Sequence, residues 1–362
     1  MNVSLAAPSL REDTLDEVNR VLREEFFLGG EAVDLFESSL KSYFDVDHAV
    51  TVDSGTRALQ FALEGLGIGE GDVVVTTPAT FIATANVILH TGATPRFVDI
   101  NLDSYGPDFN ELEQVIETEK VDAVMPIHLY GYPIDINRLR KVVGDVPIVS
   151  DACQAHGAER DGQKVGAMAD AAGLSFYPSK NMTVAGDGGV LLTDNNEVAQ
   201  IARSLRDVGR SQSGYDHERI GYTARLNTVN AAIGRKQLEA LDVWNENRRS
   251  VAARYHDAFA DLNLALPPAG DNSVVPAWYF YTIRTGQREE LGAHLDDCGI
   301  ETGRQYRRPV HLQKPYRDRG YEEGDFKHAE CWADTLLTLP CHQHMTDEQV
   351  AHVIECVREF FI

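Results

Sequence analysis

The chain has 362 residues, and its 56 acidic residues against 33 Lys and Arg give a formal net charge of −23 at pH 7. Its composition, 43% apolar and 25% charged, is that of a globular protein and excludes collagen-like, mucin-like and disordered chains. The acidic balance argues against a nucleic-acid partner, because phosphate backbones bind clustered Lys and Arg. Five cysteines without a C-x-x-C pair indicate neither a disulfide framework nor a zinc site, and we expect no metal.

The N-terminal segment carries charges where a signal peptide has its apolar run, with Arg11, Glu12 and Asp13 near its centre. No apolar run approaches the ~20 residues needed to span a bilayer, so we expect a cytoplasmic protein with no membrane partner. Only eight residues are lysines. A surface rich in acidic residues and poor in lysine suggests adaptation to a high-salt cytosol, although an ordinary acidic enzyme would have a similar composition.

After a predicted N-terminal helix at 15–25, short Val- and Ile-rich segments alternate with amphipathic stretches through the first two thirds of the chain. This alternation predicts a mostly parallel sheet with crossover helices. Seven strands are predicted, at 48–52, 72–77, 94–98, 123–127, 147–150, 171–176 and 189–193. Helices are predicted between them at 56–65, 81–90, 108–117, 135–143 and 195–207, several opened by an Asp or Asn that can cap the helix.

The pattern changes after Gly234. A long charged helix is predicted at 236–262, followed by a Pro- and Gly-containing loop at 267–270, then a strand at 278–284 and helices at 288–298 and 347–361. We therefore predict a large α/β domain over 1–240 and a smaller C-terminal α+β domain over 241–362. The N-terminal helix is a candidate to pack with the smaller domain.

Three segments near strand ends carry candidate chemistry. A strand runs through Ser54-Gly55-Thr56 into a helix whose N-terminus could hold a phosphate, although a simple helix cap explains these residues equally well. Asp151 falls at the carboxyl end of an apolar strand, where open α/β sheets bind ligands, or else it caps a helix. Lys180 follows the next strand in a loop, where a surface lysine is the simpler interpretation. Together, a phosphate site, a carboxylate for a pyridinium nitrogen and a lysine for a Schiff base are what pyridoxal 5'-phosphate (PLP) needs.

Beyond these segments, the sequence resembles the DegT-type (DegT/DnrJ) sugar aminotransferases, a family of fold-type I PLP enzymes. The matching motifs run in order from about residue 25 to residue 357. They include Ser54-Gly-Thr-Arg-Ala-Leu, Pro78-Ala-Thr-Phe-Ile-Ala-Thr-Ala-Asn, Asp151-Ala-Cys-Gln-Ala-His-Gly-Ala, Ser175-Phe-Tyr-Pro-Ser-Lys-Asn and Arg308-Pro-Val-His-Leu-Gln. The resemblance implies an aspartate aminotransferase-like fold with a large, mostly parallel seven-stranded-sheet domain and a smaller C-terminal α+β domain.

The resemblance also implies roles for individual residues. Lys180 would form the Schiff base with the cofactor and, once the substrate amine displaces it, shuttle a proton. Asp151 would keep the ring nitrogen protonated, which makes the cofactor an electron sink. Gln154 would hydrogen-bond the ring hydroxyl, and Phe81 would stack on the pyridine ring. The phosphate would be held by Gly55, Thr56 and Ser175.

In this family a residue of the neighbouring subunit reaches the phosphate, from the segment that occupies 221–234 here. Family members usually have Asn where this chain has Thr223, whose hydroxyl can still donate a hydrogen bond with shorter reach. Either Thr223 or Asn227 would make the contact. The resemblance therefore implies a homodimer with its active sites at the interface.

We expect a PLP-dependent transaminase that moves an amino group from an amino acid, with L-glutamate as the expected donor, to a nucleotide-linked keto sugar in amino-sugar or surface-glycan biosynthesis. Three alternatives remain. A sugar dehydratase of the same family is disfavoured because that branch has histidine at the position of Lys180. An aminohydroxybenzoate-type synthase keeps the lysine, so only substrate tests exclude it. A non-catalytic PLP-binding regulator would have no need of a proton shuttle.

Overall fold

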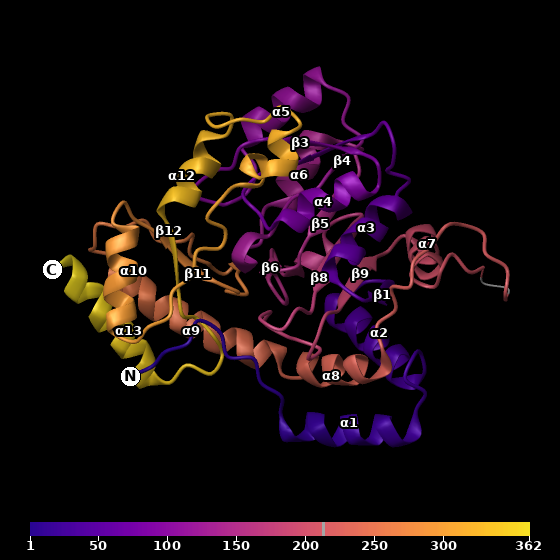
Figure 1. The fold of residues 1–362 in the computed structure, drawn as a ribbon, viewed down its shortest axis with the longest axis horizontal. Helices are drawn as coiled ribbons and strands as arrows, with labels where there is room; N and C mark the ends of the chain where they lie inside the picture. The colour runs from indigo at the N-terminus through magenta and orange to yellow at the C-terminus, as the bar shows by residue number, and fades with distance from the viewer. Residues whose placement is uncertain (212–213) are drawn as a thin grey trace.

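The structure, a computed structural model, describes residues 1–211 and 214–362. Among these residues, seven strands form a central sheet (Figure 1). One half has the order β1-β9-β8-β5 and the other the order β3-β2-β4. Parallel bridges from Val124 to Ile148 and from Ile127 to Asp151 join the halves between β4 and β5. The strands are β1 (His48–Val52), β2 (Val73–Thr76), β3 (Thr94–Phe97), β4 (Ala123–Val124), β5 (Val149–Asp151), β8 (Ala171–Ser175) and β9 (Gly189–Thr193).

The sheet is mostly parallel, as the sequence predicts. Strand β9 runs antiparallel to both its neighbours, β1 and β8, whereas β5 and β8 are parallel to each other and β2 is parallel to β3 and β4. Because β5 and β8 point the same way, their carboxyl ends, Asp151 and Ser175, lie at the same edge of the sheet. All seven predicted strands are present, and the bounds of the first and the last agree with the prediction.

Alternating side chains of the strands enter two separate hydrophobic cores, one on each face of the sheet. Ala49 and Leu192 belong to one core, and their chain neighbours Val50 and Leu191 belong to the other. Ser54, Asp108, Asp135 and Asn195 cap the following helices by accepting hydrogen bonds from backbone N–H groups. The helices around the sheet are α2 (Glu31–Phe44), α3 (Gly55–Gly65), α4 (Ile82–His90), α5 (Phe109–Thr118), α6 (Ile136–Val143) and α7 (Asn196–Arg206).

The last third of the chain builds another core around the antiparallel pair β11 (Tyr281–Arg284) and β12 (Leu336–Leu339). Helices α9 (Leu241–Phe259), α10 (Arg288–Asp297) and α13 (Asp347–Phe361) supply most of its apolar side chains. Short elements complete the chain, namely α11 (Lys314–Arg317), α12 (Lys327–Thr335), and a small sheet of β6 (Glu159–Arg160), β7 (Gln163–Lys164) and β10 (Val274–Val275). Across the described parts of the chain, each helix is too short or too polar to pass through a bilayer.

Three predicted elements are wrong in their extent, and the first is the strand predicted at 123–127, of which only Ala123–Val124 is a strand. The single helix predicted at 236–262 is two helices, α8 (Thr228–Leu238) and α9, which meet at Ala240. The sequence there holds no Pro or Gly to mark a break. Packing separates the two helices, because α8 packs against α1 and α2 whereas side chains of α9 enter the core around β11 and β12. The strand predicted at 278–284 begins only at Tyr281, because Tyr279 pairs its backbone with Tyr130 instead.

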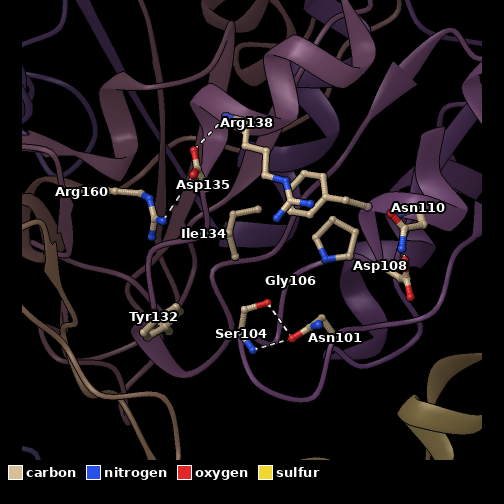
Figure 2. Close-up of a pocket in the computed structure, with 12 residues that line it drawn as sticks. Asn101, Ser104, Gly106, Asp108, Asn110, Tyr132, Ile134, Asp135, Arg138 and Arg160 are labelled. Atoms are coloured by element: carbon tan, nitrogen blue, oxygen red, sulfur yellow. Dashed lines mark hydrogen bonds and ion pairs between the residues drawn. The ribbon is translucent and has the colours of Figure 1, made fainter.

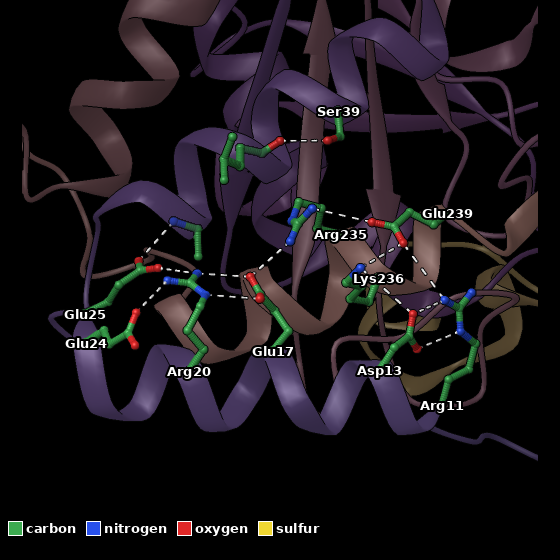
Figure 3. A network of polar contacts seen from close by, with 12 residues as sticks. Arg11, Asp13, Glu17, Arg20, Glu24, Glu25, Ser39, Arg235, Lys236 and Glu239 are labelled. Atoms are coloured by element: carbon green, nitrogen blue, oxygen red, sulfur yellow. Dashed lines mark hydrogen bonds and ion pairs between the residues drawn. The ribbon is translucent and has the colours of Figure 1, made fainter.

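The N-terminal segment contacts two separate parts of the molecule. Val3 forms a parallel bridge with Ile300, beside the last-third core, whereas α1 (Glu12–Glu24) packs along α8. An ion pair of 3.0 Å between Glu17 and Arg235 joins that helix to α8, and Arg20 of the same helix also pairs with Glu17 at 3.0 Å (Figure 3). The first residues and the helix that follows them are thus fixed to different parts of the molecule.

Candidate active site

A cavity of about 540 Å³ lies at the carboxyl ends of β5 and β8. It is the place where open α/β sheets bind ligands. Seven of the nine residues predicted from the sequence line it: Gly55, Thr56, Phe81, Asp151, Gln154, Ser175 and Lys180. Their roles stay predictions, but residues from four separate segments of the chain are brought to one cavity.

One end of the cavity is formed by the N-terminus of α3. Ser54 caps this helix by accepting a hydrogen bond from the Arg57 N–H, which leaves the first N–H groups of the helix directed at the cavity. The first turn of α3 itself contains no acidic residue, and the carboxylate nearest to it in the chain, that of Asp53, accepts a hydrogen bond from the Ser54 hydroxyl. A side chain at Gly55 would place its Cβ 2.6 Å from Cβ of Ser175. Only glycine therefore lets the helix approach the end of β8 this closely.

Asp151, the last residue of β5, is buried at 6% exposure with its carboxylate in the cavity wall. The Thr84 hydroxyl donates a hydrogen bond of 2.6 Å to Oδ2, and the Cys153 N–H donates one of 3.1 Å to Oδ1. These donors fix the orientation of the carboxylate and leave it lone pairs for a further donor. Burial raises the pKa of the neighbouring Cys153 thiol, so this group stays protonated and is a poor nucleophile.

Gln154 is held by both ends of its amide. Its Oε1 accepts a hydrogen bond of 2.8 Å from the Tyr130 N–H, and its Nε2 donates one of 3.3 Å to the Tyr306 hydroxyl. Burial raises the pKa of Tyr306, so its hydroxyl remains neutral. The ring of Tyr306 lies 5.5 Å from that of Phe81, which is 51% exposed although it lines the cavity. An aromatic face open to a cavity is a surface on which a flat ring can stack.

Lys180 stands on a loop that is fixed by side-chain hydrogen bonds of the next residue. The side chain of the next residue, Asn181, donates hydrogen bonds to Oδ1 of Asn245, at 2.8 Å, and to the Ala277 carbonyl, at 2.7 Å. Nζ of Lys180 lies 4.2 Å from the centre of the Tyr279 ring, within the range of a cation–π contact. The hydroxyls of Tyr279 and Ser179 are 2.8 Å apart. The amine is thus directed into the cavity by a rigid support.

The residues present fit PLP on three structural observations. The α3 N-terminus offers backbone N–H groups for a phosphate, Asp151 offers a buried and oriented carboxylate for a protonated ring nitrogen, and Lys180 offers an amine in the same cavity. The glycine at position 55 supplies the close approach that such a phosphate site needs.

Thr223 and Asn227 do not line this cavity in the single chain. Asn227 caps α8, with its Oδ1 accepting a 2.9 Å hydrogen bond from the Asn230 N–H. Thr223 is exposed and pairs its backbone with Asp207. Of the two predicted alternatives, the threonine is the side chain less engaged within its own subunit.

Sequence reasoning missed several residues of this site. Thr84 was within a recognised motif, but no pattern assigned its hydroxyl to Asp151. Tyr279 comes from the last third of the chain and Leu5 from its beginning, and both line the cavity. Their sequence contexts carry no local signal, because only the tertiary fold brings them to Lys180.

A smaller cavity, of about 300 Å³, lies between the start of α5 and the start of α6 (Figure 2). Its two arginines are both engaged: Arg160 pairs with Asp135 at 3.4 Å, and the Arg138 guanidinium lies 4.1 Å from the centre of the Phe109 ring. The capping carboxylates of Asp108 and Asp135 balance these charges. Lysine is not among the residues that line this cavity, whereas Lys180 lines the larger one.

Comparison with known proteins agrees with this geometry. The model of the DegT/DnrJ/EryC1/StrS aminotransferase family matches residues 8–358. The chain belongs to this family. It is 40% identical to the dTDP-3-amino-3,4,6-trideoxy-alpha-D-glucose transaminase of Streptomyces venezuelae, over 99% of this chain and 95% of that protein. It is 35% identical to a protein of Geobacillus stearothermophilus called a pleiotropic regulatory protein, over 100% of this chain and 98% of that one.

Among solved structures, the PLP form of Spr1654 from Streptococcus pneumoniae, described as a putative sugar aminotransferase, has a TM-score of 0.94, with 28% identity and 100% of both chains covered. The fold-type I architecture predicted for this DegT-family aminotransferase is thereby confirmed. The aminotransferase is a PLP-dependent enzyme, as the sequence predicted. Its cavity with Lys180 and Asp151 is the candidate cofactor site.

Proposed function

We propose that this aminotransferase transfers the amino group of L-glutamate to the ketone of a nucleotide-linked keto sugar, in amino-sugar or surface-glycan biosynthesis. The observation that carries the proposal is the common cavity of Lys180, Asp151 and the N-terminus of α3. Similarity to the transaminase of Streptomyces venezuelae supports a nucleotide-linked amino sugar as the product. Such sugars arise in cytoplasmic metabolism, and we place the enzyme there.

When bound, PLP supplies an aldehyde that takes up the amino group and a ring that withdraws electrons from the reacting carbon. Asp151 would accept a hydrogen bond from the ring nitrogen and keep it protonated, while Gln154 would fix the ring hydroxyl and Phe81 would support one ring face. The phosphate would be held at the end of the cavity formed by Gly55, Thr56 and Ser175. The amine of Lys180 takes a proton from the α-carbon of glutamate and returns it to the cofactor side.

The reaction balances over its two halves. In the first, glutamate gives up its amino group and leaves as the keto acid, with one water consumed. In the second, the sugar ketone receives the amino group and the water is released. The same lysine moves the proton in the opposite direction, and ping-pong kinetics follow because the keto acid leaves before the sugar reacts.

The absorption spectrum of the protein with added PLP tests this proposal. The wild type should show a yellow band that L-glutamate converts to the pyridoxamine form, and Lys180→Ala should lack the lysine-dependent band. Lys120→Ala, which removes an exposed lysine paired with Asp122 far from the cavity, is the matched control and should behave as the wild type. A wild type without the band would contradict the proposal.

A regulatory function is the second candidate, because the relative from Geobacillus stearothermophilus has a regulatory name. The same experiment separates the two. A band that forms with PLP but does not respond to L-glutamate, to other amino acids or to amino sugars would favour a PLP-binding regulator over an enzyme.

We further infer a homodimer whose active sites lie at the interface. Supporting this are large apolar side chains on the surface of the single chain: Phe26, Phe27 and Ile220 are 79%, 58% and 93% exposed. They lie near the segment that contains Thr223 and Asn227, since Leu28 forms a bridge with Asn227. Burying such side chains favours association.

Light scattering should give a mass twice the 40.1 kDa of one chain. To test the shared site, Lys180→Ala and Thr223→Arg subunits would be unfolded together and refolded. Hybrids should regain activity that neither parent has, because one of their two sites has both an intact lysine and an intact partner segment. A monomeric mass, or no recovery in the hybrids, would contradict the inference.

A further inference from the structure

The first residues of the chain reach the active-site cavity from a direction that the cofactor residues do not use. Leu5 and Ala6 line the same cavity as Lys180, together with Phe280, Gln305 and Tyr306. The predicted cofactor residues come from the sheet and the helices beside it. We call residues 3–6 the N-terminal arm.

Backbone hydrogen bonds fix the arm to residues 299–301. The Val3 N–H donates to the Gly299 carbonyl at 2.9 Å, and the Glu301 N–H donates to the Val3 carbonyl at 2.9 Å. The Leu5 N–H donates to Oε2 of Glu301 at 3.0 Å. Val3 itself is 1% exposed and belongs to the core of the last third of the chain. The arm is therefore part of the folded structure and not a loose end.

The other end of this segment is fixed to a different part of the molecule. Nε2 of Gln237, in α8, donates a 3.0 Å hydrogen bond to the Ser9 carbonyl, and the Ser9 hydroxyl lies 2.7 Å from Nε2 of His344. Arg11, Asp13, Lys236 and Glu239 then form a polar cluster between the start of α1 and the end of α8 (Figure 3). With both ends anchored, Leu5 and Ala6 cannot move freely away from the cavity.

The arm offers the cavity an apolar surface. The side chains of Leu5 and Ala6 carry neither charge nor hydrogen-bonding group. A Cβ at Gly303 would lie 2.8 Å from Cδ2 of Leu5, so glycine at that position makes room for the leucine. Contact with such a wall does not stabilise the binding of a carboxylate. It does stabilise the binding of a sugar ring face, or of a ring carbon without a hydroxyl, because this apolar surface is removed from water.

We propose that the N-terminal arm determines sugar specificity, with Leu5 contacting a part of the sugar ring that lacks hydroxyl groups. This inference rests on the proposed function. The contact favours deoxygenated sugars over fully hydroxylated ones, because a hydroxyl placed against Leu5 would lose its hydrogen bonds to water. L-Glutamate reacts at the same lysine but gains nothing from the arm.

The test uses the PLP form and measures its conversion to the pyridoxamine form by two kinds of amine donor. One is L-glutamate. The others are dTDP-3-amino-3,4,6-trideoxy-alpha-D-glucose, dTDP-3-amino-3-deoxy-glucose with its hydroxyls at carbons 4 and 6, and a UDP-linked 3-amino sugar. The variant is Leu5→Ser, and Leu10→Ser, a partly exposed leucine that does not line the cavity, is the matched control.

For Leu5→Ser, the concentration of the trideoxy sugar at half-maximal rate should rise about tenfold, with its limiting rate and the glutamate reaction unchanged. The preference for the trideoxy over the hydroxylated sugar should fall. The same shift should be measurable as weaker binding of the trideoxy sugar to the apoprotein by calorimetry. Thermal melting and the yellow band, equal to those of the wild type, would show that the variant is folded and loaded.

Other outcomes overturn the inference in distinguishable ways. Equal loss with glutamate and with sugar would show that the arm only supports the fold, and no change with either would show that it does not contact the substrate. If the wild type reacts with glutamate but with none of the sugars, the proposed substrate class fails and this inference fails with it.

Discussion

At the scale of single residues, Gly55 is a position that its surroundings constrain tightly. An alanine there would place a methyl group 2.6 Å from Cβ of Ser175 and 2.9 Å from Sγ of Cys153. We expect Gly55→Ala to lower the free energy of unfolding by about 1–3 kcal/mol and to weaken PLP binding about tenfold, because α3 must shift away from the phosphate end of the cavity. Chemical denaturation and PLP titration measure the two effects. Gly69→Ala, whose Cβ would be 3.6 Å from its nearest neighbour, should show neither.

His156 makes the protein sensitive to acid. Burial, with a smaller contribution from the charge of Lys180, lowers the pKa of His156 to about 3, and the imidazole stands 2.8 Å from the Ser175 carbonyl. The neutral ring donates a hydrogen bond from Nε2 to this carbonyl. Because burial penalises the charged ring, protonation is less favourable in the folded state than in the unfolded state. The contribution of His156 to the free energy of unfolding is therefore fully present above about pH 6.5. It falls by about 1.4 kcal/mol per pH unit as the pH drops towards 3.

Denaturation curves between pH 7 and pH 4 test this sensitivity. His156→Gln keeps a side-chain N–H for the Ser175 carbonyl but does not titrate, so its loss of stability with falling pH should be shallower. His90→Gln, at an exposed position in α4, should keep the wild-type slope. Equal slopes for all three proteins would contradict the assignment.

Lys180 and Asp151 could be found from the sequence because Asp151 ends one apolar strand and Lys180 lies in the loop after the next, and strand ends of a parallel sheet meet at one edge. The spacing of residues along a strand or into a helix is a local property. The contacts that orient these groups are not local: Thr84 reaches Asp151 across 67 positions, and Tyr279 lies 99 positions from Lys180. Without the fold, nothing in the sequence singles out these partners.

At the scale of elements, α1 depends on ion pairs for its place on α8. Glu17 accepts from both Arg20 and Arg235, and its side chain is only 13% exposed (Figure 3). We expect Glu17→Gln to lower the free energy of unfolding by roughly 1 kcal/mol, and less in molar KCl, because salt screens the charges. Asp16→Asn, a neighbouring exposed carboxylate on the same helix, is the control and should have little effect. An unchanged stability for Glu17→Gln at low salt would contradict the expected role.

Among the helices, those predicted well include two whose first residues carry a capping signal. Helix α7 begins at the Asn195 cap, and α13 begins at Thr346, which forms a capping box with Gln349. The junction of α8 and α9 has no such signal, since packing against α1 and α2 decides where the first helix ends. Strand β12 is four residues long and acquires its identity only by pairing with β11.

At the scale of the whole molecule, the net charge of −23 is the property with the clearest consequence. Self-repulsion among the excess acidic residues opposes folding and repels anionic nucleotide sugars, and salt screens both effects. We expect the melting temperature, and the activity at low sugar concentration, to rise between about 0.1 M and about 1 M KCl. Thermal melts and initial rates measure them. Flat or falling values would contradict adaptation to a high-salt cytosol.

The predicted fold class is confirmed for the whole molecule. A chain that alternates strands and helices can form only a few topologies with a parallel sheet, so the pattern predicts the class well. What could not be predicted is how the first residues relate to the last third of the chain. The predicted domain boundary at residue 240 divides the chain by sequence position. The N-terminal arm instead pairs with residues that come almost three hundred positions later.

The docking of Val3 beside Ile300 also sets the order of events on the ribosome. The sheet from β1 to β9 is complete once residue 193 has emerged, but the arm has no partner until residues 299–301 follow. During that interval the start of the nascent chain remains undocked, and the wall that it forms is missing from the cavity. A bulky fusion at Met1, whose carbonyl would be 2.7 Å from a Cβ at Gly299, would interfere at that step, whereas the exposed Ile362 offers a safer point of attachment.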